Sequence, residues 1–317
     1  MPKFVLTGAD GNLGSVAASY AAEIAKPEDE LTFTTYKLEA IPAATLAEWK
    51  SKGVNVVVAS YDDIESLKTA FAGAEAVTLV STWLFGEGRR RQARTVIEAA
   101  KACGVKRICY TSFIGAGIQA EKEEDIPFLP RDHHVIESYI YASGLEYNIQ
   151  RNYLYADNIP TFFGTSWKFC GDRWLTNSHG ASGAYVSRED CGRVLAVLLL
   201  GKGGKNTVYD VTGPEAVTHQ QIFDWICSQS GYKGQMVDMP DEELKDYWLG
   251  RGLPTDSFGD FSALPMKLCI GDLLCSGEMV ARGFMQETSD TVEKLTGRKP
   301  APFQEALLKY KDLFPKP

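Results

Sequence analysis

The sequence lacks the features that mark a membrane protein, a disulfide-rich protein or a structural zinc protein. No apolar run approaches the roughly 18 residues that a membrane-spanning helix needs. The seven cysteines are odd in number and include no C-x-x-C pair, which argues against a disulfide framework and against a cysteine-ligated zinc site. No charged and then apolar leader precedes the first apolar segment, residues 3–7. We therefore expect a cytoplasmic protein with no membrane span and no metal site.

Basic residues are in deficit, with 33 Lys and Arg against 41 Asp and Glu and a net charge of −8. Nucleic-acid binding depends on clustered cations, and the one dense basic run, Arg89–Arg91, is short. We therefore do not expect nucleic acid as a partner. The 44% hydrophobic and 23% charged residues are typical of a folded soluble protein. What the sequence does have in quantity is glycine, at 29 residues.

Short apolar runs alternate with amphipathic stretches through the first half of the chain, the pattern of a parallel sheet with helices on both faces. Strands are predicted at residues 3–7, 31–35, 55–59, 76–81, 107–112 and 146–151. Helices are predicted between them at residues 14–25, 43–52, 64–72, 90–103 and 132–143. The fold class is therefore α/β, a Rossmann-type doubly wound parallel sheet.

The alternation breaks after residue 152. Residues 152–186 are rich in aromatics and glycine, a helix at 189–200 and a strand at 207–211 follow, and the tail from residue 219 reads as mainly helical. We expect an NAD(P)-binding domain at 1–152 and a smaller, mainly helical substrate-binding region at 153–317. Parts of 185–212 are expected to return to the sheet.

Three glycines, Gly8, Gly11 and Gly14, follow the first strand and open the first helix. Glycine at this junction permits a tight turn and a close approach to a pyrophosphate, and the helix N-terminus supplies N–H groups. The motif therefore predicts a dinucleotide site. Its contacts are expected from the three glycines and the intervening Asp10, Asn12 and Leu13.

Several segments resemble the NmrA-like family of atypical short-chain dehydrogenases, and most of all its NADPH-dependent type 2 quinone oxidoreductases and triphenylmethane dye reductases. They are Leu6–Gly14, Ala70–Ala74, Ala99–Lys106, Tyr110–Ser112, Ser143–Tyr147 and Arg151–Asn152. The likeness is dense over residues 3–155 and looser as far as residue 297. It implies a Rossmann fold, a nicotinamide cofactor and a small organic acceptor.

The second strand ends in Tyr36 and Lys37, with no carboxylate before Glu39. An acid here would hold a ribose 2′-OH and a cation would hold a 2′-phosphate, so NADP(H) is expected rather than NAD(H). The resemblance implies adenine contacts from Ser60 and Tyr61 and a nicotinamide contact from Asn152. Strand ends add four further candidates for cofactor contact: Ser81, Thr82, Thr111 and Ser112.

The sequence contains no Tyr-x-x-x-Lys, the acid–base pair of ordinary short-chain dehydrogenases. The resemblance puts His133 where relatives carry a catalytic Lys or His. Glu137 lies one helical turn later and is expected to orient the imidazole. The alternative is that His133 caps or packs at the start of its helix.

Aromatic side chains follow the predicted strand ends, where ligands of open α/β sheets bind. We expect a substrate pocket lined by Trp83, Phe85, Phe113, Tyr153 and Tyr155. Such a pocket suits a quinone or another aromatic acceptor, since stacking and alignment would supply most of the catalytic effect.

The leading hypothesis is an NADPH-dependent oxidoreductase that transfers hydride to a quinone, enone or aromatic carbonyl. Two alternatives remain open: a non-catalytic dinucleotide or redox-sensing regulator, and a cofactor-assisted isomerase or cyclase of a specialised metabolite. The expected partner is a small molecule, and the chain is expected to be a monomer or a homodimer.

Overall fold

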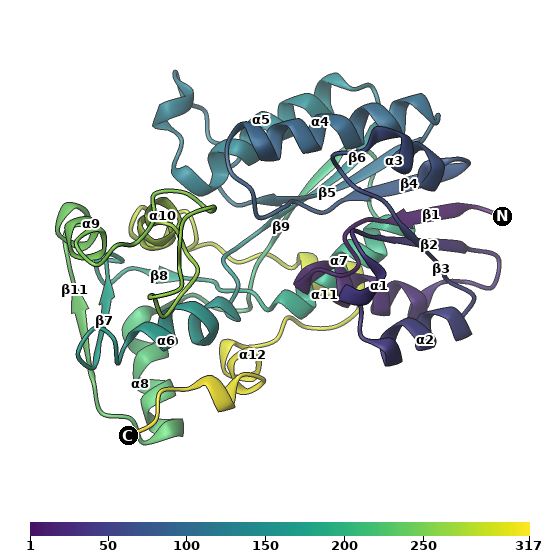
Figure 1. Ribbon diagram of the computed structural model, residues 1–317. Helices are drawn as coiled ribbons and strands as arrows, with labels where there is room; N and C mark the ends of the chain where they lie inside the picture. The colour runs from purple at the N-terminus through teal and green to yellow at the C-terminus, as the bar shows by residue number, and fades with distance from the viewer.

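A computed structural model describes residues 1–317, and a seven-stranded, all-parallel sheet organises the first half of the chain (Figure 1). The strand order is β3-β2-β1-β4-β5-β6-β9. The strands are β1 Lys3–Leu6, β2 Glu30–Thr35, β3 Asn55–Val58, β4 Ala74–Leu79, β5 Arg107–Phe113, β6 Glu146–Asn152 and β9 Thr207–Val211. The order reverses direction at β1, which makes the carboxyl ends of β1 and β4 the topological switch point.

Helices cover both faces of the sheet (Figure 1). On one face lie α3 Ile64–Phe71, α4 Glu87–Ala102 and α5 Phe128–Ala142. On the other lie α1 Asn12–Ile24, α2 Ala43–Ser51, α7 Arg188–Leu199 and α11 Thr291–Thr296. Strand β1 illustrates the two-sided burial, because Phe4 and Leu6 pack into one cluster and Val5 into the other. The doubly wound Rossmann-type fold predicted from the sequence is confirmed.

The chain returns to the sheet after an excursion. Strand β9 pairs in parallel with β6, and α7 packs closely along α1. The approach of these helices requires glycine, because a Cβ on Gly192 would lie 2.6 Å from Val16 Cγ1 and 3.1 Å from the Ala17 nitrogen. Residues of α7 and β9 thus complete the nucleotide-binding layer.

The second half of the chain forms a smaller lobe beside the sheet (Figure 1). Its helices are α6 Gly164–Ser166, α8 His219–Ser230, α9 Asp241–Leu249, α10 Ile270–Ala281 and α12 Phe303–Leu308. Four short strands make two small sheets: β7 Arg173–Thr176 with β11 Gln235–Asp238, and β8 Ser182–Gly183 with β10 Val217–Thr218. Short 3-10 helices occur at Leu38–Ala40, Glu123–Asp125 and Lys311–Leu313, and a π-helix at Ile159–Phe163. Trp167 and Trp174 are fully buried and stack in the core of this lobe.

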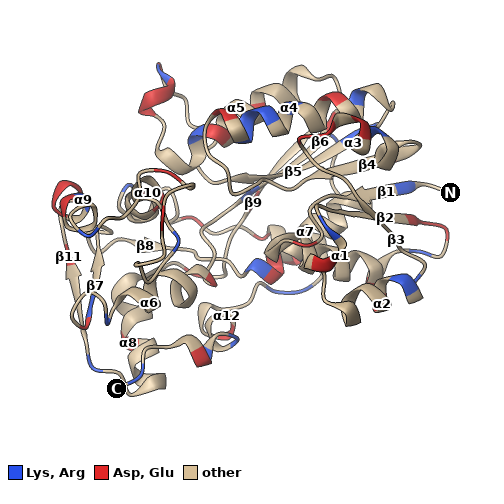
Figure 2. Ribbon diagram, in the orientation of Figure 1, with Lys and Arg blue, Asp and Glu red and all other residues tan.

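The structure differs from the prediction mainly at helix starts and in the second lobe. Helix α5 begins at Phe128 rather than Asp132, because Pro127 is its N-cap and Pro130 lies in the first turn, where a missing N–H is tolerated. The four short strands of the second lobe were not predicted from the sequence. Charges of both signs are interspersed over helices and loops (Figure 2), and no helix is long and apolar enough to cross a membrane.

Candidate cofactor and substrate cleft

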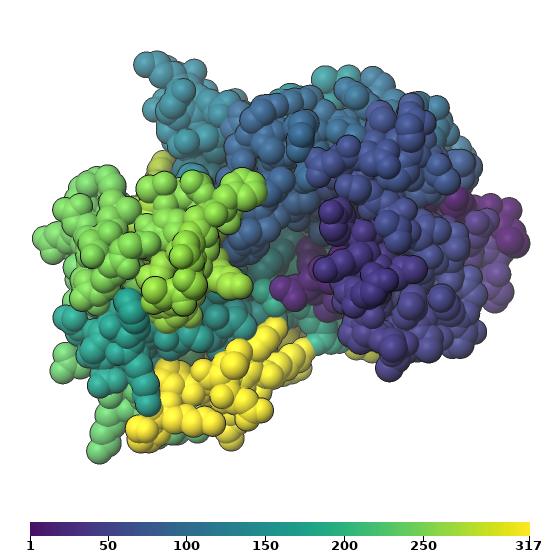
Figure 3. Space-filling view, viewed as in Figure 1, coloured from purple at the N-terminus to yellow at the C-terminus, as the bar shows by residue number.

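A cleft of about 500 Å³ opens at the carboxyl ends of the central strands, between the two lobes. In the space-filling view the surface is hollowed between the purple-to-blue N-terminal half and the green and yellow C-terminal segments (Figure 3). Most residues predicted to contact the cofactor line it: Gly8, Asp10, Gly11, Asn12, Leu13, Gly14, Tyr61, Ser81, Thr82, Thr111 and Ser112. The predicted aromatics Trp83, Phe85, Phe113, Tyr153 and Tyr155 also line it. One cavity therefore joins the glycine loop to the aromatic cluster.

The glycine loop fits a dinucleotide pyrophosphate. Gly8 adopts φ +67°, and a Cβ on Gly14 would lie 1.9 Å from the Gly8 carbonyl oxygen, so both positions need glycine. Gly11 is the N-cap of α1 and offers no side chain to its N–H groups. The helix therefore begins with N–H donors free for an anion, which its dipole also favours.

Polar side chains beyond the glycine loop also line the cleft, and some of them connect the strands that form its wall. Ser81 and Thr82 line the cleft, and their buried hydroxyl oxygens make no hydrogen bond within the protein. Thr111 Oγ1 accepts the Ser81 N–H at 2.8 Å. The Tyr61 hydroxyl bonds to Thr7 Oγ1 and the Val80 carbonyl, so it ties β1 to β4 while the residue lines the cleft.

Four of the residues predicted to bind cofactor do not line the cleft: Tyr36, Lys37, Ser60 and Asn152. The Ser60 hydroxyl accepts the Asp62 N–H in a local turn. Tyr36 and Lys37 extend into solvent at the carboxyl end of β2, with Tyr36 70% exposed. Neither side chain is held by a neighbouring side chain, so both remain accessible to a 2′-phosphate.

His133 is buried in the cleft wall between two partners. Its Nε2 lies 3.3 Å from Arg89 Nη1 and its Nδ1 lies 2.7 Å from the Tyr110 hydroxyl. Arginine can only donate, which assigns Nε2 as acceptor and puts the ring proton on Nδ1. Burial, and then the charge of Arg89, lowers the pKa of His133 well below its ordinary value. In this geometry the neutral ring holds the Arg89 guanidinium and has no proton on Nε2 to donate.

Glu137 does not touch the imidazole, and the expected orienting contact is wrong. Its carboxylate accepts from Ser112 Oγ at 2.6 Å, from Arg151 Nε and Nη2 at 2.9 and 2.6 Å, and from the Tyr141 hydroxyl at 2.8 Å. Arg151 pairs with Ser112 across β5 and β6, so the sheet register brings a guanidinium to Glu137. A charged, two-point bond of this kind is stronger than one to a neutral ring.

Asn152 is buried behind the cleft rather than exposed in it. Its Nδ2 donates to the Tyr155 hydroxyl at 2.9 Å, and its Oδ1 accepts from Gln150 Nε2 at 2.9 Å. Tyr155 itself lines the cleft, with the Arg188 guanidinium 5.2 Å from its ring centre. The Asn152 side chain therefore supports Tyr155 in this structure, and its contact with a nicotinamide stays a prediction.

Sequence reasoning missed three charged residues of the cleft wall: Arg89, Arg188 and Asp272. Arg89 is 7% exposed, and its guanidinium lies 4.6 Å from the Phe85 ring centre. Asp272 is 6% exposed, and burial raises the pKa of its carboxyl to about 7 against the opposing charge of Arg89. For Asp272 the available signal was a charged residue in a helix that is otherwise mostly apolar. Arg89 lies in the polar run Arg89–Gln92, so no such signal marked it.

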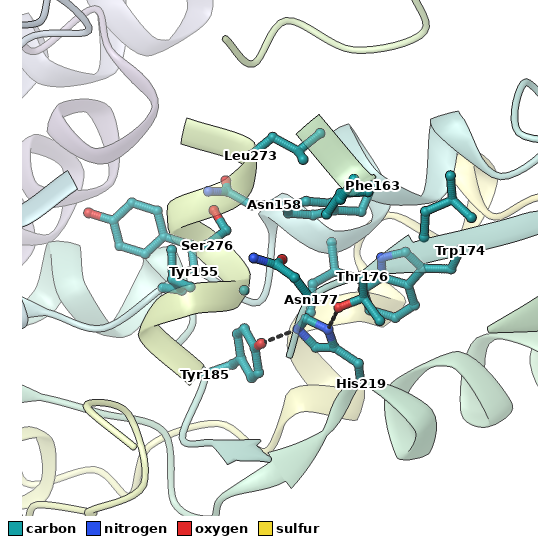
Figure 4. Close-up of a pocket in the computed structure, with 15 residues that line it drawn as sticks. Tyr155, Asn158, Phe163, Trp174, Thr176, Asn177, Tyr185, His219, Leu273 and Ser276 are labelled. Atoms are coloured by element: carbon teal, nitrogen blue, oxygen red, sulfur yellow. Dashed lines mark hydrogen bonds between the residues drawn. The ribbon is translucent and has the colours of Figure 1, made fainter. Parts of the chain in front are cut away.

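A smaller inner pocket continues from the cleft into the second lobe (Figure 4). Tyr155, Asn158, Phe163 and Ser276 line both spaces. At its far end His219 is fixed between the Thr176 and Tyr185 hydroxyls, both within 2.7 Å, and burial lowers the pKa of His219 to about 4. His219 stacks on Trp174, with ring centres 4.6 Å apart, which makes this end a rigid part of the core.

Curated relatives match nearly the full length of the chain. It is 24% identical over 308 residues to an NmrA-like family domain-containing oxidoreductase of Aspergillus flavus, covering 96% of this chain and 94% of the relative. It is 27% identical over 267 residues to quinone oxidoreductase 2 of Escherichia coli, covering 81% and 82%.

Solved structures share the fold. The NADPH-dependent quinone oxidoreductase QOR2 of Escherichia coli, in complex with NADPH, superposes with a TM-score of 0.78 at 24% identity, covering 96% of this chain and 98% of that one. The triphenylmethane reductase of Citrobacter sp. gives 0.77 at 23% identity, covering 98% and 100%. The model of a family described as NAD(P)H-binding matches residues 8–200. The chain therefore belongs to the NAD(P)H-binding family and is an NAD(P)H-dependent oxidoreductase of the NmrA-like type.

Proposed function

We propose that the protein uses NADPH to reduce a small planar acceptor, a quinone, an enone or an aromatic carbonyl, by hydride transfer in the cleft. The observation that carries this proposal is the single cavity that runs from the glycine loop to the five aromatic residues at the strand ends. A cofactor whose pyrophosphate lies on α1 and an acceptor among the aromatics would meet in that cavity.

Different residues of the chain would bind different parts of the cofactor. The N–H groups at the start of α1 would bind the pyrophosphate, and Lys37 beside Tyr36 would bind a 2′-phosphate. When bound, NADPH would supply the hydride. A preference for NADP(H) is supported by the absence of a carboxylate at the end of β2 and by solved neighbours that are complexes with NADPH or NADP(H).

The aromatic cluster supports a flat acceptor. Trp83 is 53% exposed and lies 5.9 Å from Phe162, between ring centres. Phe85 lies 4.9 Å from Phe128. Trp83 and Phe85 from the strand-end loop and Phe162 from the second lobe thus line the same cavity, where an aromatic ligand would be held by stacking.

The experiment is NADPH oxidation measured against a panel of quinones, enones, aromatic aldehydes and triarylmethane dyes, with NADH in parallel. We expect turnover with at least one planar acceptor and a lower KM for NADPH than for NADH. Trp83→Ala should raise the acceptor KM without changing the Kd for NADPH. Phe258→Ala, at a residue that is 79% exposed and outside the cleft, is the matched control and should change neither. Absence of turnover with every acceptor would contradict the proposal.

A further inference from the structure

A carboxyl group without a protein partner lies in the cleft wall. Asp272 is the third residue of α10, and no side chain or backbone group hydrogen-bonds to its carboxyl oxygens. It is 6% exposed and lines the same cavity as the glycine loop and the aromatic residues. Burying a polar group without a hydrogen bond is unfavourable, so an unpaired buried carboxyl at a ligand cavity calls for a functional explanation.

Arg89 supplies a fixed positive charge to the same part of the cleft. Its side chain is buried, its Nε has no hydrogen-bond partner, and it is held by His133 Nε2 and by the Phe85 ring. Arg89 and Asp272 form no ion pair with each other. The Asp272 carboxyl and Arg89 Nη2, which no protein group engages, therefore retain bonding capacity for a ligand in the cavity.

Burial raises the pKa of the Asp272 carboxyl to about 7, so a large share of this group is protonated at neutral pH. The charge that opposes protonation comes from Arg89 on α4, and it is outweighed by burial. From α5, His133 is neutral, and Asp132 is occupied by the Gly86 N–H and the Arg90 guanidinium. The Cys275 thiol on α10 and the Cys269 thiol at its N-cap have raised pKa values. On α9, the Asp241 carboxylate accepts a hydrogen bond from Asn177. Strand β8 contributes no titratable group.

We propose that Asp272 and Arg89 form the oxygen-binding site of the cleft, in which Arg89 holds the acceptor oxygen and Asp272 donates a proton to it. The proposal rests on the proposed function and adds to it the class of acceptor, one whose reduction creates an oxyanion. His133 is then a positioning residue that fixes the guanidinium.

The step balances for a quinone. The acceptor gains a hydride, with its two electrons, from NADPH, and the negative charge develops on the acceptor oxygen beside Arg89. The Asp272 O–H bond breaks as the new O–H bond forms on that oxygen, which gives a hydroquinone and an Asp272 carboxylate. Water entering the cleft then returns a proton to the carboxylate, so one quinone, one NADPH and one solvent proton are consumed.

A triarylmethane dye makes the discriminating comparison. Such a cation takes the hydride on carbon and becomes neutral without any proton. An acid in the cleft should therefore accelerate quinone reduction and leave dye reduction alone.

The experiment compares single-turnover rates of hydride transfer to a quinone and to a triarylmethane dye in the wild type and in Asp272→Asn. We expect a loss of about 100-fold or more with the quinone, the typical contribution of a general acid, and a change of less than about threefold with the dye, since only an acid-dependent step is removed. The wild-type quinone rate should fall as pH rises through about 7, where Asp272 loses its proton. That decrease should be absent with the dye. Glu278→Gln, a carboxylate elsewhere on α10, is the control and should behave as wild type.

A readout that needs no turnover checks the same group. In cofactor-free protein labelled with 13C at aspartate carboxyls, one resonance should titrate near pH 7 and be missing in Asp272→Asn. Equal losses for quinone and dye in Asp272→Asn, or no loss for either, would overturn the proposal, as would Asp272 titrating in the ordinary range of aspartate. A wild-type protein that reduces neither acceptor would instead overturn the proposed function and the proton transfer with it.

Discussion

Gly14 carries the most severe single-residue constraint in the cleft, because a Cβ there would lie 1.9 Å from the Gly8 oxygen and 2.7 Å from its carbonyl carbon. Gly14→Ala should displace the loop that receives the pyrophosphate. We expect at least about a tenfold rise in the Kd for NADPH, equivalent to about 1.4 kcal/mol, and a loss of about 1–3 kcal/mol in the free energy of unfolding. Calorimetric titration and urea unfolding measure the two effects.

Gly88→Ala is the control for this substitution. Gly88 lies in α4, and the nearest atom to an added Cβ is Leu84 Cδ1 at 3.4 Å, an ordinary contact. Alanine should leave the Kd unchanged and raise stability by up to about 1 kcal/mol, since alanine is the better helix former. A Gly14→Ala protein that binds NADPH with the wild-type Kd would contradict the assignment of the glycine loop as the pyrophosphate site.

Burial of His219 as a neutral ring makes the stability of the fold depend on pH. The pKa of His219 is about 4 in the folded protein, below the ordinary 6.5, because the neutral ring is buried. Between pH 6.5 and 4 the unfolded chain therefore binds a proton at His219 that the folded chain does not bind. The contribution of His219 to the free energy of unfolding is complete above pH 6.5 and declines as pH falls toward 4. The expected slope from this residue is about 1.4 kcal/mol per pH unit.

Urea unfolding of His219→Gln between pH 7 and 4.5 should show this slope removed relative to the wild type. His179→Gln is the control, because His179 is half exposed and its ring bonds to Asp238. That variant should not reduce the slope. Identical pH dependence in His219→Gln and the wild type would show that the ring is not buried as a neutral group.

Residues whose role is set by neighbours in the chain could be predicted, and residues whose role is set by distant neighbours could not. Gly8 and Gly14 follow from the strand–turn–helix junction alone. The sequence predicts His133, one helical turn away, as the partner of Glu137. The register of β5 and β6 instead places Arg151 beside the Glu137 carboxylate. Asp272 and Arg89 are 183 positions apart in the chain, and no local sequence pattern predicts that they lie near each other.

At the level of elements, the loop between β4 and α4 forms one wall of the cleft through Trp83 and Phe85. It ends at Gly86, with φ +63° and ψ −140°, whose N–H donates to Asp132 Oδ2 at 2.6 Å. Gly86→Ala should cost about 1–3 kcal/mol of stability through backbone strain. It should also move both aromatics and lower kcat/KM for the acceptor by up to about 100-fold, as misplaced binding groups do.

Gly73→Ala is the matched control for Gly86→Ala. Gly73 has φ +72° and connects α3 to β4 at the edge of the sheet away from the cleft, with no atom within 4 Å of an added Cβ. It should lose similar stability and keep the wild-type kcat/KM. If steady-state kinetics show an equal fall in kcat/KM for both variants, the loss is due to general destabilisation and not to the position of the aromatic residues.

The elements of the first half were predictable because periodicity and turn residues there agree with one another. The central strands β1 and β4 carry mostly apolar side chains, as burial on both faces favours, and glycines end several helices. The short strands β8 and β10 have two residues each, too few to produce a period-2 pattern. Helix α5 starts four residues before the predicted Asp132, because Pro130 is tolerated in its first turn.

For the whole molecule, the main finding is that one cleft draws its walls from both lobes. The nucleotide loop comes from the sheet layer, and Leu268, Asp272 and Ser276 come from the second lobe at α10 and the segment before it. The two lobes are joined near the cleft by Arg188 and Tyr310, which both bond to Asp157. The Rossmann layer was predictable from its repeated units. The packing of α10 on α5 depends on contacts such as the Leu129 N–H with Cys275 Sγ, which sequence patterns do not reveal.

The central claim is that bound NADPH and a planar acceptor meet in this cleft. The most direct test is a stopped-flow single turnover, in which the protein saturated with NADPH is mixed with a quinone and NADPH absorbance is followed. Bound NADPH should be consumed much faster than free NADPH with the same quinone, and Gly14→Ala at equal NADPH should lose this acceleration. Tight binding of NADPH with no consumption beyond the uncatalysed rate, for quinones and dyes alike, would contradict the central claim.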